Sequence, residues 1–128
     1  MAVDLKINTL IVENSAANRK SIKNMLKTIG LSIISEAPTC QEALTAIAQQ
    51  QNDKNPIEFI ILSYAQTDGD GITLTAKIRE ISKAKILMTT PEPDPERVLN
   101  GLKAGVNSVI VFPFSAVDLN AKIKQIFK

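Results

Sequence analysis

Short apolar runs alternate along this chain with segments of helical period, and this alternation limits the folds that the chain can adopt. The apolar runs are rich in Ile, Leu and Val, and they cover residues 7–13, 32–37, 57–63, 85–90 and 108–112. Because polar residues scarcely interrupt them, they indicate strands whose sheet is covered on both faces. The pattern therefore predicts an α/β fold, a doubly wound, five-stranded parallel sheet with helices on both sides.

Each predicted strand is followed by a segment with a single apolar stripe, which predicts five helices. Capping residues mark the ends of these segments independently, because the first N–H groups of a helix need side-chain acceptors. The predicted caps are Thr39 paired with Glu42, Ser115 followed by Asp118, Asp94 followed by Pro95, and the helix-ending Gly30 and Gly105.

Composition excludes several classes of function. The length of 128 residues suits one domain, which we expect to span 1–128. The chain has 15 basic and 13 acidic residues, so it lacks the excess of positive charge typical of nucleic-acid-binding proteins. The chain has one cysteine and no apolar stretch of membrane-spanning length, so we expect a cytoplasmic protein without a membrane partner. Histidine is absent, which removes the commonest general base and argues against an enzyme of the Ser/His/Asp kind.

Sheets of this type bind ligands beyond the carboxyl ends of their strands, so the residues that follow the strands are the functional candidates. Glu13 and Asn14 come at the end of the first predicted strand, and Ser63 ends the third. Thr90 ends the fourth strand and Phe112 the fifth. The sequence predicts that these five side chains gather at one edge of the sheet.

Several local patterns near these positions resemble the receiver domains of two-component response regulators, with the order of elements of the bacterial chemotaxis receiver. The patterns are residues 10–19 around Glu13-Asn14, residues 36–44, Asp70-Gly71, Thr90 and Phe112-Pro113-Phe114. The resemblance covers essentially the whole chain. It implies the (βα)5 flavodoxin-like receiver fold and a part in phosphorelay signal transduction.

The resemblance also implies a set of site residues, which this chain keeps only in part. In the family, two acidic groups hold magnesium, an aspartate accepts the phosphoryl group, a hydroxyl senses it and a lysine pairs with it. Glu13 keeps the first acidic position, and Thr90 keeps the hydroxyl. Asn14, Ser63 and Phe112 stand in place of the second acid, the acceptor aspartate and the lysine.

These departures weaken different requirements of phosphoryl transfer. Magnesium prefers carboxylate ligands, so we expect no required cofactor and at most weak magnesium binding at Glu13. A serine hydroxyl such as Ser63 needs a base to activate it, and the apolar Phe112 supplies no stabilising charge. We therefore expect a pseudo-receiver without catalytic residues, not phosphorylated on aspartate, that acts through protein–protein interaction.

Two alternatives remain open from the residues. In the first, the chain is an active phosphorelay receiver, and Ser63 or a displaced carboxylate such as Asp68 accepts the phosphoryl group. Asp68 lies in a Gly-rich turn, where aspartate usually serves the turn itself. In the second, the chain is a flavodoxin-like cofactor binder, which is the weakest reading because Glu13 stands where a phosphate cradle would need backbone donors and glycine.

The resemblance further implies where a partner would bind. In receivers, the face made by the fourth helix, fifth strand and fifth helix commonly contacts other proteins, which here corresponds to residues 94–105 and 108–127. The expected partner is a histidine kinase or another signalling protein. Pro113 belongs to the switch and pocket region, and the resemblance implies that the Phe112-Pro113 bond is cis.

Overall fold

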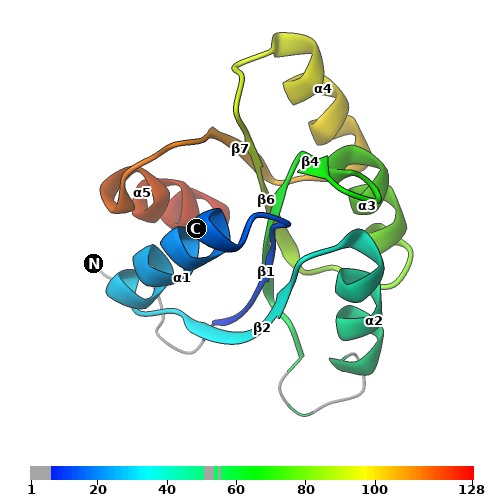
Figure 1. Ribbon diagram of the computed structural model, residues 1–128, viewed down its shortest axis with the longest axis horizontal. Helices are drawn as coiled ribbons and strands as arrows, with labels where there is room; N and C mark the ends of the chain where they lie inside the picture. The colour runs from blue at the N-terminus through cyan, green and yellow to red at the C-terminus, as the bar shows by residue number, and fades with distance from the viewer. Residues whose placement is uncertain (1–6, 51–53, 55) are drawn as a thin grey trace.

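The computed structural model describes residues 7–50, 54 and 56–128, and its centre is a five-stranded parallel sheet (Figure 1). The sheet has the order β2-β1-β3-β6-β7, which confirms the predicted doubly wound α/β fold. Its strands are β1 (Asn8–Val12), β2 (Ser32–Ala37), β3 (Phe59–Ser63), β6 (Lys85–Thr90) and β7 (Ser108–Val111). The second and fourth predicted strands keep their predicted bounds, and the other three are slightly shorter than predicted.

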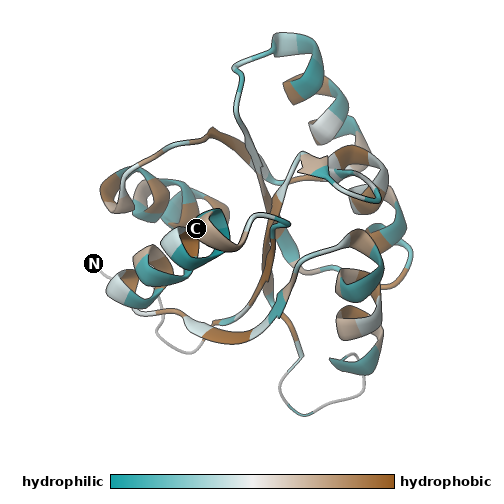
Figure 2. Cartoon of the chain, viewed as in Figure 1, coloured by the Kyte–Doolittle hydropathy of each residue, from teal (hydrophilic) through white to brown (hydrophobic). Residues whose placement is uncertain are grey.

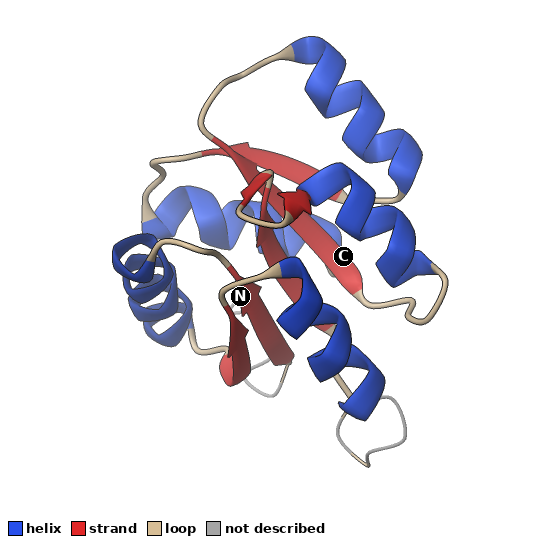
Figure 3. Ribbon diagram, turned by 45° about the vertical axis from the view of Figure 1, so that its right-hand side comes forward, coloured by secondary structure: helices blue, strands red, loops and turns tan. Residues whose placement is uncertain are grey.

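Helices cover both faces of the sheet, as Figures 1 and 3 show. They are α1 (Ala16–Ile29), α2 (Cys40–Gln50), α3 (Gly71–Arg79), α4 (Pro95–Ala104) and α5 (Ala116–Ile126). Helices α1 and α5 lie on one face, and α2, α3 and α4 lie on the other. Within the described residues, no helix is long and apolar enough to cross a membrane.

The strands are apolar on both sides because their alternate residues pack into two separate cores. Ile61 and Leu87 belong to the core under α1 and α5, whereas their neighbours Leu62 and Met88 belong to the core under α2, α3 and α4. Figure 2 shows the result, with apolar residues along the strands and hydrophilic ones on the outer faces of the helices. This alternation also decides which strand-end residues face the same side.

The structure confirms the predicted helix caps. The side chains of Asp94 and Ser115 accept hydrogen bonds from backbone N–H groups at the starts of α4 and α5. Thr39 Oγ1 accepts from the backbone N–H of Glu42 at 3.1 Å. Gly30 and Gly105 end α1 and α4 with positive φ angles of 109° and 121°, which side-chain-bearing residues rarely adopt.

A small antiparallel hairpin after β3 was absent from the sequence prediction, which placed a turn there. It joins β4 (Ala65–Gln66) to β5 (Gly69–Asp70) and brings the chain back to the end of β3. Gly71 then starts α3 so close to β3 that a Cβ atom at this position would lie 2.8 Å from the Ser63 carbonyl oxygen. Glycine thus lets α3 begin directly beside the candidate site.

Candidate functional site

A cavity of about 280 Å³ opens at the carboxyl ends of β1, β3, β6 and β7. It lies where the fold predicts a ligand site, and it brings together four of the predicted site residues. The residues that line it are Glu13, Asn14, Ser15, Asn18, Ser63, Ala65, Thr89, Pro91 and Phe112. Glu13 is the only ionisable side chain among these lining residues.

Glu13 follows β1 and is buried, with 5% of its surface exposed. Its Oε2 atom accepts a hydrogen bond from the backbone N–H of Ser15 at 2.9 Å. In the amide orientation that satisfies its neighbours, Asn14 Nδ2 donates to the same Oε2 atom at 3.0 Å. All hydrogen bonds to this carboxylate from the described residues therefore fall on Oε2, and Oε1 keeps its capacity to accept.

Ser63 is also buried, and its hydroxyl is engaged locally. Ser63 Oγ donates to the carbonyl oxygen of Ala65 at 3.2 Å, and Asn14 Nδ2 approaches the same carbonyl at 3.3 Å. Both lone pairs of the Ala65 carbonyl thus have a donor. The side chain of Gln66 links the ends of β1 and β3. Its Nε2 atom donates to the Ser63 carbonyl at 2.7 Å and to the Val12 carbonyl at 3.4 Å.

Thr90, the predicted sensing hydroxyl, lies outside the lining of this cavity. Successive strand residues point to opposite faces, so Thr89 faces the cavity and Thr90 faces the side of α4. Thr90 is fully buried, and its Oγ1 atom donates to the carbonyl oxygen of Glu92 at 3.2 Å. Sequence reasoning missed Thr89, which the pairing of Ser63 with Thr89 across β3 and β6 would have identified.

Arg97 holds the hydroxyl of Thr90 from helix α4. Arg97 Nη1 donates to Thr90 Oγ1 at 3.0 Å, and the guanidinium carbon lies 3.8 Å from the centroid of the Tyr64 ring. A cation over an aromatic face is attracted by the ring quadrupole. Arg97 therefore ties α4 to the residue that follows Ser63 and to the end of β6.

Phe112 forms one wall of the cavity and does not fill it. The side chain is half-buried, packs on the core beneath α1 and α5, and meets Phe114 edge to face at a centroid distance of 5.4 Å. The Phe112-Pro113 peptide bond is cis, as the resemblance implied. Pro113 lies outside the cavity and lines a separate groove beside β7 and α5 instead.

Asp68 points away from the cavity and caps helix α2. Its two carboxylate oxygens accept from the backbone N–H groups of Cys40 at 2.8 Å and Gln41 at 3.1 Å. These two hydrogen bonds hold the pKa of Asp68 below its usual value, and the one from Cys40 has the larger effect. The pKa of the Cys40 thiol is raised to about 11, mainly by burial and further by Asp68.

The lining residues do not supply the donor set that magnesium needs. Magnesium requires about six hard oxygen ligands in near-octahedral geometry. Asn14 turns its nitrogen inward, the Ala65 carbonyl is saturated, and Glu13 has one oxygen left. In the described part of the chain, no three His, Cys, Asp or Glu side chains gather in a way that could hold a metal ion.

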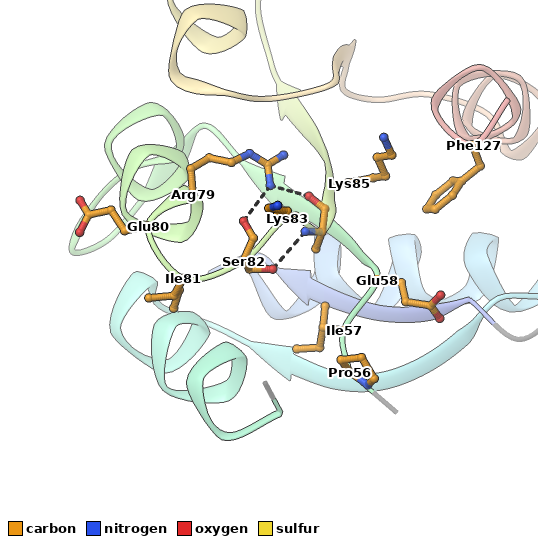
Figure 4. A pocket seen from close by; sticks show the side chains of 11 residues that line it. Pro56, Ile57, Glu58, Arg79, Glu80, Ile81, Ser82, Lys83, Lys85 and Phe127 are labelled. Carbon is orange, nitrogen blue, oxygen red and sulfur yellow. Dashed lines mark hydrogen bonds between the residues drawn. The ribbon is translucent and has the colours of Figure 1, made fainter. Parts of the chain in front are cut away.

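A larger cavity, of about 650 Å³, lies at the opposite end of the sheet near the start of β6 (Figure 4). Arg79 lies at its edge, and Figure 4 shows the guanidinium directed toward the loop that contains Ser82. Arg79 donates to the carbonyls of Gly105 at 2.8 and 3.0 Å, of Ala84 at 2.6 Å and of Ser82 at 3.3 Å, and to Asn107 Oδ1 at 3.1 Å. This arginine uses all its donors to join α3 to the loops before β6 and β7.

Known proteins resemble this chain in sequence over most of its length. Curated relatives include the chemotaxis protein CheY-3 of Vibrio cholerae, 32% identical over 93% of this chain and 90% of its own length. The chemotaxis protein CheY of Pseudomonas aeruginosa is 30% identical over 93% of this chain and 94% of its own length.

Solved structures have the same fold. A two-component response regulator from Clostridium difficile superposes with a TM-score of 0.82 at 31% identity, covering 94% of each chain. The CheX-CheY-BeF3-Mg2+ complex of Borrelia burgdorferi contains a chain with a TM-score of 0.85 at 24% identity, covering 95% of this chain and 90% of that one. The family model described as the response regulator receiver domain matches residues 9–124. The chain therefore belongs to the response regulator receiver domain family.

Proposed function

We propose that this receiver domain of two-component signalling acts through protein contacts and is not phosphorylated on its own site. One observation carries the proposal: the side chains at the acceptor position and at the second acidic position, Ser63 and Asn14, both donate to the Ala65 carbonyl. A serine hydroxyl that donates to a backbone carbonyl has no base beside it to take its proton, and an amide nitrogen is not a ligand for a metal ion. Their hydrogen bonds stabilise a closed local network instead.

The chemistry of the cavity supports this proposal. A serine hydroxyl becomes a nucleophile when a base removes its proton, and no side chain accepts a hydrogen bond from Ser63 Oγ in the described structure. Phosphoryl transfer also depends on positive charge around the transferring group. The cavity lining has the apolar Phe112 and the anionic Glu13, and it has no lysine or arginine.

The position of Thr90 supports a fixed conformation rather than a phosphorylation switch. Its hydroxyl bonds to Arg97 and to the Glu92 carbonyl, on the side of the sheet away from the cavity. To report on a group in the cavity, Thr90 would have to break both hydrogen bonds. We infer that Arg97 keeps α4 in one arrangement regardless of phosphoryl donors.

The proposed partner surface is the face formed by α4, β7 and α5. Its large exposed apolar side chains are Leu99 (52%), Leu102 (47%), Val111 (40%) and Val117 (78%). All four belong to α4, β7 or α5, and exposed apolar side chains gathered on one face favour protein binding. Receivers of this family are generally non-catalytic and interact with histidine kinases and other signalling proteins. A histidine kinase or another signalling protein of the cytoplasm is therefore the partner class proposed here.

Treatment with acetyl phosphate and magnesium, or with beryllofluoride and magnesium, tests the proposal. We expect the intact mass to stay unchanged and the amide NMR spectrum to show no shifts around Ser63. The control is the triple variant Asn14→Asp, Ser63→Asp, Phe112→Lys, which restores the family set. It should gain the mass of one phosphoryl group under the same conditions.

The alternative, an active receiver using Ser63 or Asp68, has weaker support because Asp68 caps α2 and faces away from the cavity. Stoichiometric modification of the unaltered protein would overturn the proposal. Peptide mapping would then assign the acceptor, either to Ser63 or to the hairpin that contains Asp68.

A further inference from the structure

The cavity at the strand ends has hydrogen-bond acceptors without partners. Glu13 has only 5% of its surface exposed, and its Oε1 atom receives no hydrogen bond from any described residue. Arg19, the cation that contacts Glu13, donates to the backbone carbonyl of Glu13 at 2.7 Å rather than to its carboxylate. A buried carboxylate with one open oxygen favours a donor that carries positive charge.

Two hydroxyls add further acceptors around the same space. Thr89 is 2% exposed and lines the cavity, and within the described residues its hydroxyl has no hydrogen-bond partner. Ser63 Oγ uses its only proton toward Ala65, so its lone pairs remain to accept. These oxygen atoms are not among the sealed, unpaired polar atoms of the described interior, and their residues line the cavity, so their lone pairs are available to a ligand there.

The chemistry of the lining selects among ligand classes. An anion would meet Glu13 without any lysine or arginine to balance it. A magnesium ion would find too few oxygen ligands. A primary ammonium group has three N–H donors, one for each open acceptor on Glu13, Thr89 and Ser63. The ring of Phe112 offers an apolar wall for the alkyl chain next to the ammonium group.

We infer that this cavity binds the end of an alkylammonium group, through Glu13 Oε1, Thr89 Oγ1 and Ser63 Oγ. Its volume of about 280 Å³ suits a group of this size rather than a nucleotide or a flavin. The inference rests on the proposed function, since a phosphoryl group would occupy the same cavity. The ammonium group comes either from a small free amine or from a lysine side chain of a polypeptide.

The experiment titrates butylammonium chloride into the protein labelled with nitrogen-15, at constant ionic strength. We expect saturable amide shifts at the cavity residues Ser15, Ser63, Ala65 and Thr89. Tetramethylammonium chloride is the control for charge alone, because it has no N–H donor, and it should bind at least tenfold more weakly. This readout is independent of acetyl phosphate, so failure here and failure of the proposed function are distinguished.

Variants locate the binding groups. Glu13→Gln should weaken butylammonium binding by about tenfold or more, because a charge-assisted hydrogen bond is lost. Thr89→Val keeps the shape of the side chain and should weaken binding about threefold or more. Glu92→Gln is the matched control, since it removes one negative charge at an exposed residue outside the cavity lining, and it should leave the affinity unchanged.

A second titration with Nα-acetyl-lysine methylamide separates the two sources. Tighter binding than butylammonium supports a polypeptide lysine, and equal or weaker binding supports a free amine. The inference is overturned if neither compound gives saturable shifts, if tetramethylammonium binds equally well, or if Thr89→Val and Glu13→Gln both retain full affinity. If Glu13→Gln does not fold, the affinity of Thr89→Val for butylammonium is the test: weaker binding supports the inference, and full affinity overturns it.

Discussion

The two ends of the sheet each contain a partly or fully buried charge, and the two charges are treated differently. At the start of β6, Arg79 directs every N–H of its guanidinium to a carbonyl or amide oxygen. At the end of β1, Glu13 has hydrogen bonds on one carboxylate oxygen and an open cavity beside the other. A fully bonded charge stabilises the fold, whereas a half-bonded one has capacity for a ligand.

The largest expected effect comes from Arg79→Met, which keeps much of the alkyl chain and removes the guanidinium. The carbonyls of Gly105 and Ala84 would lose their donors, and burial raises the cost of such unpaired groups. Burial already lowers the pKa of Arg79, in agreement with its desolvated position. We expect the free energy of unfolding to fall by about 3 kcal/mol in urea denaturation.

The matched control for Arg79→Met is Lys77→Met, an exposed residue of the same helix. It should change stability by less than about 0.5 kcal/mol. A loss below about 1 kcal/mol for Arg79→Met would mean that water satisfies these carbonyls, and the contrast between the two ends of the sheet would disappear.

A smaller effect on stability is expected at the other end, for Glu13→Gln. The glutamine carbonyl can still accept from the Ser15 N–H, and the neutral amide is less costly to bury than a carboxylate. We expect the free energy of unfolding to change by less than about 1 kcal/mol, in either direction, by the same measurement. A fall of about 3 kcal/mol in the free energy of unfolding would mean that the Glu13 carboxylate stabilises the fold as Arg79 does.

The smallest effect is expected at Asp68, whose cap is exposed to solvent. Its folded-state pKa is lowered by the N–H groups of Cys40 and Gln41, so the carboxylate stabilises the fold above its unfolded pKa. That stabilisation is lost as the pH falls through the lowered folded pKa. Asp68→Asn should therefore lower Tm at pH 7, and the difference from the unaltered protein should vanish in acid.

Thermal unfolding followed by circular dichroism across this pH range measures the effect of Asp68→Asn. Glu80→Gln serves as the control, because the Glu80 carboxylate makes no hydrogen bond in the described structure. A Tm difference for Asp68→Asn that stayed constant down to acid would show that capping by charge is not its cause.

Features that depend on neighbours in the sequence were predictable. The caps Ser115 and Asp94 bond to N–H groups within three residues, so their pattern is visible in the chain itself. Asp68 caps a helix start 28 residues away, and only the folded hairpin brings the two together. The parallel strands were predictable from their apolar runs because both faces of the sheet are covered.

Because both faces of the sheet are buried, the sequence could not predict which face the side chain of each strand-end residue lies on. Thr89 and Thr90 are both buried, so no apolar-polar alternation shows which of them shares the cavity with Ser63. The contacts of Arg79 and Arg97 were equally hidden, because their partners come from other elements. The departures proposed at positions 14, 63 and 112 came from the resemblance in sequence, whereas the direction of the Asn14 amide nitrogen, toward Glu13 and Ala65, required the structure.

The stacking of Arg97 on Tyr64 gives this protein an intrinsic optical reporter. Tyr64 is the sole tyrosine of the chain, and the chain has no tryptophan. Its tyrosine emission therefore arises from one ring, and the guanidinium carbon of Arg97 lies 3.8 Å from the centroid of that ring. Any event that moves α4, from partner binding to a change in the cavity, can be followed without attaching a dye.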